Sequence, residues 1–155
     1  TKSDLILRDI QILQAMNTPA VSVSVAFTDN RIRRRFEAHT IDTEARIKAL
    51  MELKKAGIRT SALICPVIPY ITDVKPLIDM LAPHTDKIWI YGFSILNRSD
   101  QNCRNVQNIL ENHFPDLKER IETALFSKDH PYWKKLRQEL IELQKDRQLN
   151  LSIHL

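Results

Sequence analysis

The sequence predicts an α/β fold in which parallel strands alternate with helices. Three segments with strand character each lie next to a segment with helical spacing of apolar residues. This regular alternation is typical of right-handed βαβ units and a mostly parallel sheet. The chain has only two glycines and contains neither a GxGxxG nor a P-loop motif, which argues against the usual dinucleotide and nucleotide-triphosphate domains.

Residues 3–16 are predicted to form the first helix. Ser3 can cap its amino end, Asp4 complements the helix dipole, and apolar residues recur near the helical period up to Met16. The chain enters this helix from Thr1 without a lead-in segment. In an α/β fold we therefore expect a strand to precede it in a longer polypeptide.

The segment VSVSVAF, residues 21–27, is the first predicted strand, because Val and Ser alternate in it and β-branched residues favour extended backbone. Residues 28–40 are polar and are expected to form a short helix or a loop. Asp42 is the predicted N-cap of the next helix. That helix carries a broad apolar stripe and ends at Gly57.

The second strand is predicted over residues 58–65, and a Pro-X-X-Pro turn from Pro66 to Pro69 follows it. Proline has no backbone N–H and disfavours helix in the residue before it, so this turn should be a rigid extended loop where the strand ends. A short helix over 74–81 and a third strand over 87–93 continue the alternation.

The carboxyl-terminal part is predicted to be mainly helical. The expected elements are a polar helix over 100–114, a helical region over 115–146 in which Pro131 starts the last helix, and a short strand over 150–154. This predicts two units, residues 1–95 with the parallel βα elements and residues 96–155 as a helical extension with a short final strand.

Composition narrows the class of protein. The net charge of +4 comes from 23 basic and 19 acidic residues, and much of the excess lies in the arginine run from Arg31 to Arg35. Cys65 and Cys103 have no CxxC spacing, and the histidines show no HExxH pattern, so neither a disulfide framework nor a zinc hydrolase is indicated. We expect a soluble, cytoplasmic protein, since no apolar run reaches the ~18 residues that span a bilayer.

The carboxyl ends of parallel strands meet at one edge of the sheet, so residues there are the first candidates for a site. Lys2 and Ser3 lie at the exit of the expected preceding strand, although Ser3 can equally be a helix cap. Ser22 and Ser24 place small hydroxyls in a strand. They either bind a ligand lying across the sheet or bond locally.

Arg46 and the proline turn are the other two candidates. Arg46 shares a helix face with apolar residues, and an inward arginine needs an anion, which is either a ligand or a side chain such as Glu37 or Asp42. Within Cys65–Pro69, the two prolines should leave Val67 with free amide and carbonyl groups that can bond the edge of a flat heteroaromatic ring. The alternative is a plain rigid loop.

Taken in order, these segments resemble the radical S-adenosylmethionine (SAM) superfamily and, within it, the branch similar to spore photoproduct lyase. The matching segments are TKS with LILRDI after it, VSVSVAFTD, Glu37 in a polar loop, EAR-IKAL-MELKKAGI, and PVIPYITD at residues 66–73. Their order and spacing agree with the family over residues 1–93.

The resemblance implies part of an incomplete TIM-like (β/α)6 barrel. In the whole enzyme, a [4Fe-4S] cluster held by a CxxxCxxC loop would cleave SAM reductively to a 5′-deoxyadenosyl radical, which abstracts hydrogen from a substrate that the sequence does not identify. By position, the resemblance places Ser24 near the ribose or methionine part of SAM and Arg46 at the methionine carboxylate. The implied adenine contacts are Pro66, Val67, Ile68 and Pro69, and the implied substrate-cavity residues are Lys2 and Ser3.

The chain also departs from the family pattern. It lacks CxxxCxxC and the glycine-rich segment expected after the second strand, and Cys65 and Cys103 cannot replace three clustered thiolates. Ala38 follows Glu37 where the family usually has proline, and Tyr70 follows PVIP where glycine is frequent. The resemblance therefore implies the carboxyl-terminal portion of a longer enzyme, inactive by itself.

The sequence also allows two other functions, and it has one physical consequence. The arginine run could bind the phosphates of a nucleic acid, as a basic binding module, or form an ordinary solvated helix face. The chain could also be a noncatalytic barrel that serves as a scaffold for partners. If the preceding strands are missing, the strand at Val21 is an open edge, and such edges pair, so we expect self-association.

Overall fold

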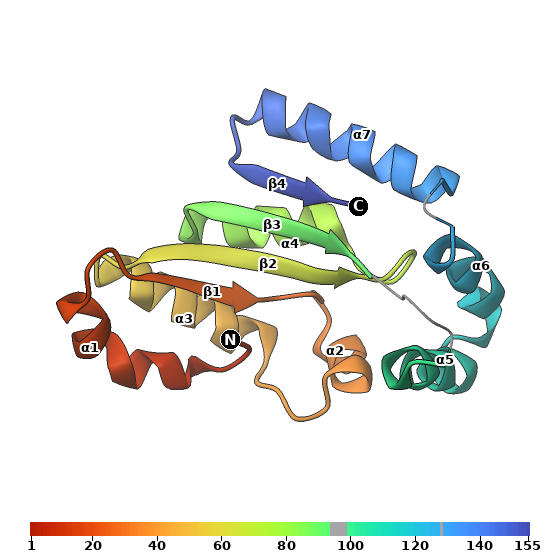
Figure 1. Ribbon diagram of the computed structural model, residues 1–155, viewed down its shortest axis with the longest axis horizontal. Helices are drawn as coiled ribbons and strands as arrows, with labels where there is room; N and C mark the ends of the chain where they lie inside the picture. Colours follow the sequence, from red (N-terminus) through yellow and green to blue (C-terminus); the bar gives the residue numbers. More distant parts are fainter. Residues whose placement is uncertain (94–98, 128) are drawn as a thin grey trace.

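The computed structural model describes residues 1–93, 99–127 and 129–155 and has an α/β fold. Within these residues, four strands form one sheet in the order β1-β2-β3-β4, and every neighbouring pair is parallel (Figure 1). This confirms the predicted α/β class and the mostly parallel sheet. The strands are β1 (Ala20–Ser24), β2 (Arg59–Val67), β3 (Lys87–Gly92) and β4 (Leu151–His154).

Helices connect the strands and cover the sheet. They are the 3-10 helix η1 (Asp4–Asp9), α1 (Ile10–Ala15), α2 (Asn30–Phe36), α3 (Thr43–Lys55), α4 (Val74–Leu81), the 3-10 helix η2 (Ala82–His84), α5 (Gln101–His113), α6 (Pro115–Leu125) and α7 (Pro131–Asp146). Helix α4 has the predicted bounds. The first helix begins as a 3-10 helix. Helix α3 ends at Lys55, and Gly57 follows its C-cap with a φ of 76°, in the left-handed region that favours glycine.

The prediction that the second strand ends at Cys65 is wrong, because β2 continues through Pro66 to Val67. A proline inside a central strand lacks the N–H that the ladder needs. The register between β2 and β3 shifts between Ile64 and Val67, so a bulge accommodates the missing donor. The Cys65–Pro66 peptide bond is cis.

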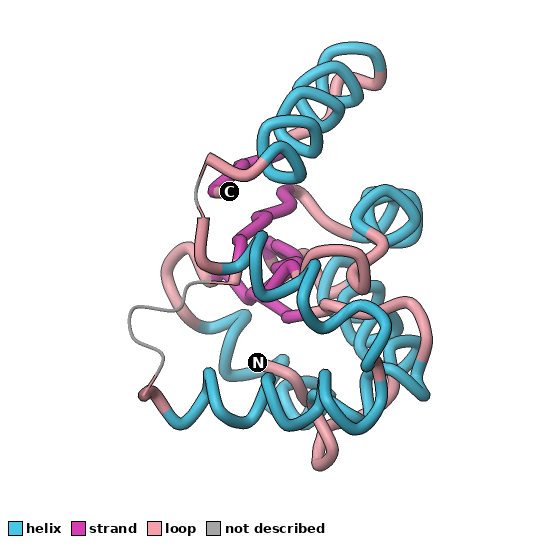
Figure 2. Tube along the Cα trace, turned by 90° about the vertical axis from the view of Figure 1, so that its right-hand side faces the viewer, coloured by secondary structure: helices cyan, strands magenta, loops and turns pink. Residues whose placement is uncertain are grey.

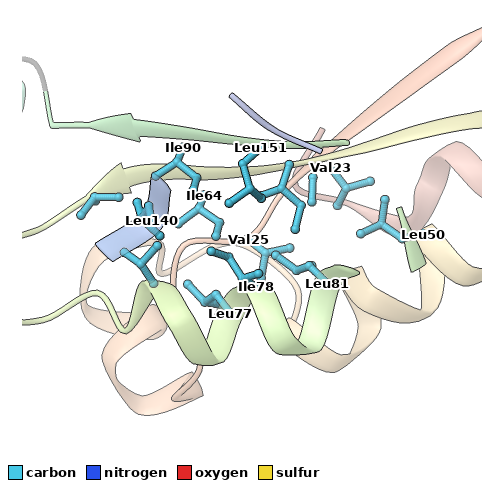
Figure 3. Packing of buried hydrophobic residues seen from close by; sticks show 14 of the residues in the cluster. Val23, Val25, Leu50, Ile64, Leu77, Ile78, Leu81, Ile90, Leu140 and Leu151 are labelled. Carbon is cyan, nitrogen blue, oxygen red and sulfur yellow. The ribbon is translucent and has the colours of Figure 1, made fainter. Parts of the chain in front are cut away.

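The main core lies between one face of the sheet and the helices. Figure 3 shows Val23, Ile64, Ile90 and Leu151 of the strands facing Leu77, Ile78 and Leu81 of α4, with Leu50 of α3 and Leu140 of α7 beside them. Burial of such aliphatic side chains stabilises the fold by about 1.5–3 kcal/mol each. Because α7 and β4 belong to this same core, residues of the predicted extension help to complete the sheet.

The boundary predicted between residues 95 and 96 lies outside the described residues. The following helices α5 and α6 lie beyond the carboxyl ends of the strands, as Figure 1 shows. They enclose a second, smaller apolar cluster with the segment after β1 and the turn after β2. Its buried members are Ala26, Phe27, Ile68, Ile71, Val106, Leu110 and Ile121.

The other face of the sheet is polar and aromatic. Ser22 and His154 are exposed on it, and Trp89 and Tyr91 are half-buried. Figure 2, turned to look at the carboxyl ends of the strands, shows α3 and α4 together on one side of the sheet. Parallel sheets are ordinarily covered by apolar residues on both faces, so a polar, partly exposed face is unusual for this architecture.

In the part of the chain that the structure describes, the helices are all too short or too polar to serve as membrane spans.

Candidate functional site

A cavity of about 250 Å³ lies where the segment after β1, the turn after β2 and helix α5 meet. Its walls are mainly apolar and include Phe27, Phe36, Ile68 and Phe93. The polar groups at its margin are Lys2, Glu37, Asn102 and Asn105. An apolar cavity with a few polar groups at the carboxyl edge of a parallel sheet is the usual form of a small-molecule site in this architecture.

Glu37 is the charged centre of this region. It follows α2, and its side chain is only 6% exposed. Its Oε1 is 2.5 Å from Nζ of Lys2, and its Oε2 is 2.6 Å from Nη2 of Arg46. A buried carboxylate is stable when cations and hydrogen-bond donors satisfy both oxygens, and here each oxygen has its own cation.

Arg46 is the most completely buried charged side chain of the site, at 1% exposure. Its Nη1 donates to the carbonyl of Ser24 at 2.9 Å, its Nε donates to the carbonyl of Ile41 at 3.1 Å, and its Nη2 also donates to Oγ1 of Thr40. These bonds use four of the five N–H donors of a guanidinium. The anion expected for this inward arginine is therefore Glu37. The placement of the methionine carboxylate of SAM at Arg46 stays a prediction.

The arginine run is neither one solvated helix face nor one phosphate-binding patch, because Arg33 is buried. Its side chain is buried, donates to the carbonyls of Glu37 and Thr40, and pairs with Oδ1 of Asp42 at 2.9 Å. Asp42 occupies the N-cap position of α3 as predicted, but its side chain makes no cap bond. Arg33 thus braces the loop between α2 and α3.

The two strand serines bond locally. The Oγ atoms of Ser22 and Ser61 are 2.6 Å apart, and Oγ of Ser24 donates to the carbonyl of Cys65 at 3.3 Å. Ser24 lies beside the site because its own carbonyl accepts from Arg46. Cys65 is half-buried, and burial raises the pKa of its thiol, although Lys2 lowers it and Glu37 raises it to a smaller extent. A neutral thiol is a poor nucleophile.

The end of β2 and the turn after it each contribute one wall of the cavity, Pro66 from the strand and Ile68 from the turn. The expectation that Val67 has a free carbonyl is wrong, because that oxygen accepts from the Phe93 N–H at 3.2 Å. Phe93 directly follows β3, so the extended chain beside β2 satisfies this carbonyl. The Ile68 N–H donates to Oγ1 of Thr72 at 2.9 Å, which closes the turn. Pro69 is buried and does not line the cavity.

Tyr70 holds this turn against the carboxyl-terminal helices. Its φ of 63° is in the left-handed region, which a non-glycine residue adopts at a cost. Its ring lies 4.8 Å from that of Tyr132, and the Arg120 guanidinium lies 4.0 Å above it. These contacts compensate for the backbone conformation of Tyr70.

Lys2 and Ser3 have different contacts in the structure, and only Lys2 lies at the cavity. Lys2 lines the cavity and pairs with Glu37, whereas Oγ of Ser3 accepts from the Leu5 N–H at 3.2 Å and caps η1. The sequence prediction of α5 as only a polar helix does not identify its two cavity residues, Asn102 and Asn105. The available signal is the amide-rich sequence QNCRNVQN, because carboxamides can both donate and accept hydrogen bonds to a ligand.

The acidic, histidine and cysteine side chains do not gather into a metal site: over the described ranges, no three of them are grouped closely enough to hold an ion. Cys65 lies in β2 and Cys103 in α5, and no disulfide joins them. The sequence contains no third cysteine.

Comparison with known proteins gives two groups of relatives. A protein of Methanocaldococcus jannaschii described as "Uncharacterized protein MJ0683" is 31% identical over 121 residues, which are 78% of this chain and 45% of that protein. The Mycobacterium tuberculosis "Uncharacterized protein Rv2578c" is 31% identical over 84 residues, 52% of this chain and 25% of that protein. The chain thus spans less than half the length of these relatives. No family model and no solved structure matches the chain.

Proposed function

We propose that this chain is the carboxyl-terminal portion of a radical SAM enzyme of the branch similar to spore photoproduct lyase, and that its cavity receives the adenosyl part of SAM. The observation that carries the proposal is that four separate segments of the chain meet at one place. The four segments are Lys2, the Glu37 loop, Arg46 and the segment from Pro66 to Ile68 at the end of β2. The resemblance singled out all four, and they meet at one cavity or its charged margin.

The residues of the cavity fit a flat heterocycle. Phenylalanine rings and Ile68 offer apolar surface for its faces, and Asn102 and Asn105 offer amides for its edge. A carboxamide can donate and accept side by side, which matches the donor and acceptor pattern of adenine. The described cavity is about 250 Å³, so we assign it to the adenine ring and not to the whole SAM molecule.

Arg46 and Glu37 define how the polar part of a ligand would enter. A ligand carboxylate at Arg46 must compete with Glu37, which Lys2 holds by its other oxygen. We infer that Arg46 fixes the rim of the site by joining Ser24, Thr40 and Glu37, and that a bound carboxylate would take over part of that role.

The residues of this chain do not fit the cluster. Three cysteine thiolates are needed, and the sequence has two, located in different elements. We therefore assign no redox or radical step to this chain. The proposal requires the cluster ligands and the remaining strands of an incomplete (β/α)6 barrel to come from other residues. The greater length of both relatives leaves room for such residues.

The test is calorimetric titration of this chain with SAM. We expect saturable binding that Asn105→Leu weakens by about tenfold, as for loss of one well-placed hydrogen bond. Asn112→Leu is the matched control, because Asn112 lies on the same helix, is exposed and does not line the cavity. Equal affinities of the two variants, or no binding by the original chain, would overturn the assignment of the cavity.

A second experiment addresses the cluster. The longer natural polypeptide should turn brown on anaerobic reconstitution with iron and sulfide and should cleave SAM under reducing conditions. A longer sequence without three clustered cysteines would contradict the radical SAM assignment.

A basic nucleic-acid-binding module is the second candidate function, and the exposed part of the arginine run favours it. Arg34 and Arg35 are exposed on α2, and in the described ranges neither makes an ion pair. Two free guanidiniums next to the cavity residue Phe36 can contact phosphates. Salt-dependent DNA binding that is lost in Arg34→Gln/Arg35→Gln and retained in Arg31→Gln would support this function, whereas equal loss in all variants would refute a specific site.

A further inference from the structure

A second pocket, of about 410 Å³, lies between the turn after β2 and the helices α6 and α7. Figure 1 shows the start of α7 next to α6, beyond the carboxyl ends of the strands. Among the residues that the structure describes, this pocket and the candidate site have no lining residue in common. Pockets of about 300–1,000 Å³ are the usual size for small organic ligands.

Arg120 of α6 brings an unpaired cation to this second pocket. Its guanidinium lies 4.0 Å from the centre of the Tyr70 ring, and over the described ranges it makes neither an ion pair nor a hydrogen bond. A cation–π contact orients a guanidinium and leaves its N–H donors for another partner. The contact with Tyr70 therefore positions Arg120 without neutralising it.

Two further donors come from the beginning of α7. His130 is the N-cap residue, and its Nδ1 accepts from the Tyr132 N–H at 3.2 Å. Because Nδ1 is the acceptor, the neutral ring carries its proton on Nε2, which remains a donor. Nζ of Lys135 is 4.0 Å from Oε1 of Glu139, whereas Nζ of Lys75 is 3.0 Å from Oε2. Glu139 thus has a closer cation, and Lys135 keeps its charge for a ligand.

The backbone at the amino end of α7 is not the source of the donors. The first helical residue, Pro131, has no N–H. The N–H groups of Tyr132 and Trp133 donate to the side chain and the carbonyl of His130. An anion in this pocket would therefore be held by side chains.

The pocket also has an apolar part, formed by Tyr70, Pro131, Tyr132 and Leu136. The two tyrosine rings are 4.8 Å apart, and Leu136 is buried. Cationic side chains beside apolar surface suit a ligand in which an anionic group is attached to an apolar or aromatic body.

We propose that this pocket binds a small phosphate ester with an apolar or aromatic organic part. The phosphate group has three terminal oxygens, which match the three donor side chains Arg120, His130 and Lys135. A carboxylate has two oxygens, and the fork of one guanidinium can satisfy both. The organic part of the ester lies against the tyrosine rings.

A nucleic acid fits these residues less well than a small ester. Asp129, which precedes His130, is 94% exposed and pairs with Lys134 at 3.7 Å, and Glu139 lines the pocket itself. Both carboxylates would repel the neighbouring phosphates of a continuous backbone. This site requires neither SAM nor a cluster, so the proposed function and the phosphate-ester site can fail independently.

The experiment is a nuclear magnetic resonance titration of this chain with phenyl phosphate at constant ionic strength, with inorganic phosphate and benzoate in parallel. We expect a saturable shift of the Tyr132 backbone amide, and phenyl phosphate should bind about fivefold or more tightly than either reference anion. Inorganic phosphate lacks the organic part, and benzoate lacks the third oxygen. Equal affinity of phenyl phosphate and either reference anion would overturn the assignment, and so would a titration without saturation.

Two variants test the donors. Arg120→Gln and Lys135→Gln should each weaken binding of phenyl phosphate by about fivefold or more, because each removes one charge-assisted hydrogen bond. Arg104→Gln is the matched control, since Arg104 is exposed on α5 and does not line the pocket.

Lys135 is exposed and contacts no ring, so Lys135→Gln should keep the unfolding midpoint of the original chain. Full affinity in either donor variant would overturn the proposal. A short single-stranded oligonucleotide that binds more tightly than phenyl phosphate, and that loses affinity in the same two variants, would assign these residues to a nucleic acid instead.

Discussion

Arg46 and Glu37 form a buried ion pair in which Nη2 and Oε2 are 2.6 Å apart and the side chains are 1% and 6% exposed. The pair joins the first turn of α3 to the loop after α2, and through the Ser24 carbonyl it also reaches the end of β1. A buried ion pair contributes little net stability by itself, because desolvation offsets the attraction, but removing one partner is costly. The pair therefore fixes the geometry of this edge of the sheet.

Arg46→Leu should destabilise the protein by about 3–5 kcal/mol, because it leaves the Glu37 carboxylate buried with only Lys2 beside it. Urea unfolding followed by circular dichroism measures the change. Arg34→Leu is the control, since Arg34 is exposed and should change the free energy of unfolding by at most about 0.5 kcal/mol. Similar losses in the two variants would show that the pair has no special role.

Tyr70 offers a test of backbone strain. Tyr70→Ala and Tyr70→Gly both remove the ring that contacts Tyr132 and Arg120, but only glycine adopts a φ of 63° without steric cost. We expect Tyr70→Gly to be the more stable variant by about 1 kcal/mol in thermal or urea unfolding. An alanine variant of equal or greater stability would mean that the turn relaxes out of the left-handed region.

The phenol of Tyr132 should titrate at unusually high pH. Burial raises its pKa to about 12 from 10.0, although a backbone hydrogen bond from Tyr70 lowers it. Between these values the unfolded chain has lost the proton and the folded protein retains it, so stability falls as pH rises from about 10 to about 12. Ultraviolet titration of phenolate measures the transition. Tyr132→Phe should lose the transition at highest pH and show a weaker decline in stability, and an unchanged titration curve would contradict the assignment.

The chain by itself should self-associate through its open edge. Strand β1 exposes Ala20 and Ser22 next to the apolar side of η1–α1, and unprotected edges pair. Analytical ultracentrifugation should show an average mass that rises with concentration. Ala20→Lys should shift the chain toward monomer, because a charge on an edge strand opposes pairing, whereas Asn108→Lys on exposed α5 should not. A strictly monomeric chain at high concentration would refute this prediction.

The order and type of the helices and strands could be predicted from the sequence, because apolar spacing and the positions of glycine and proline act locally. Helix α4 has a regular apolar spacing with Pro76 in its first turn, and Gly57 supplies the positive φ just after α3. The end of β2 did not follow from these rules. Proline predicts a strand end, but the bulge before Val67 and the ladder bond from Phe93 to its carbonyl are tertiary features that override the local preference.

The position of the site could be predicted from the sequence, but the ion pairs within it could not. Sequence spacing indicated that Arg46 points inward, yet the choice of Glu37 over Asp42 depends on how the loop after α2 folds back. The same loop buries Arg33 between carbonyls and Asp42, which a short run rich in arginine does not reveal. The contribution of α5 depends on residues far apart in sequence, such as Phe36 and the α5 residues that line the cavity with it, and no local pattern encodes their meeting.

Nuclear magnetic resonance of the side-chain amides of Asn102 and Asn105 during titration of this chain with SAM tests directly whether the cavity holds the adenine ring. We expect both signals to shift with the same saturation as the overall binding curve, while the signal of the exposed Asn112 amide on α5 stays unchanged. Binding of SAM with no shift at Asn102 or Asn105 would contradict the placement of the adenine ring in the cavity beside Ile68.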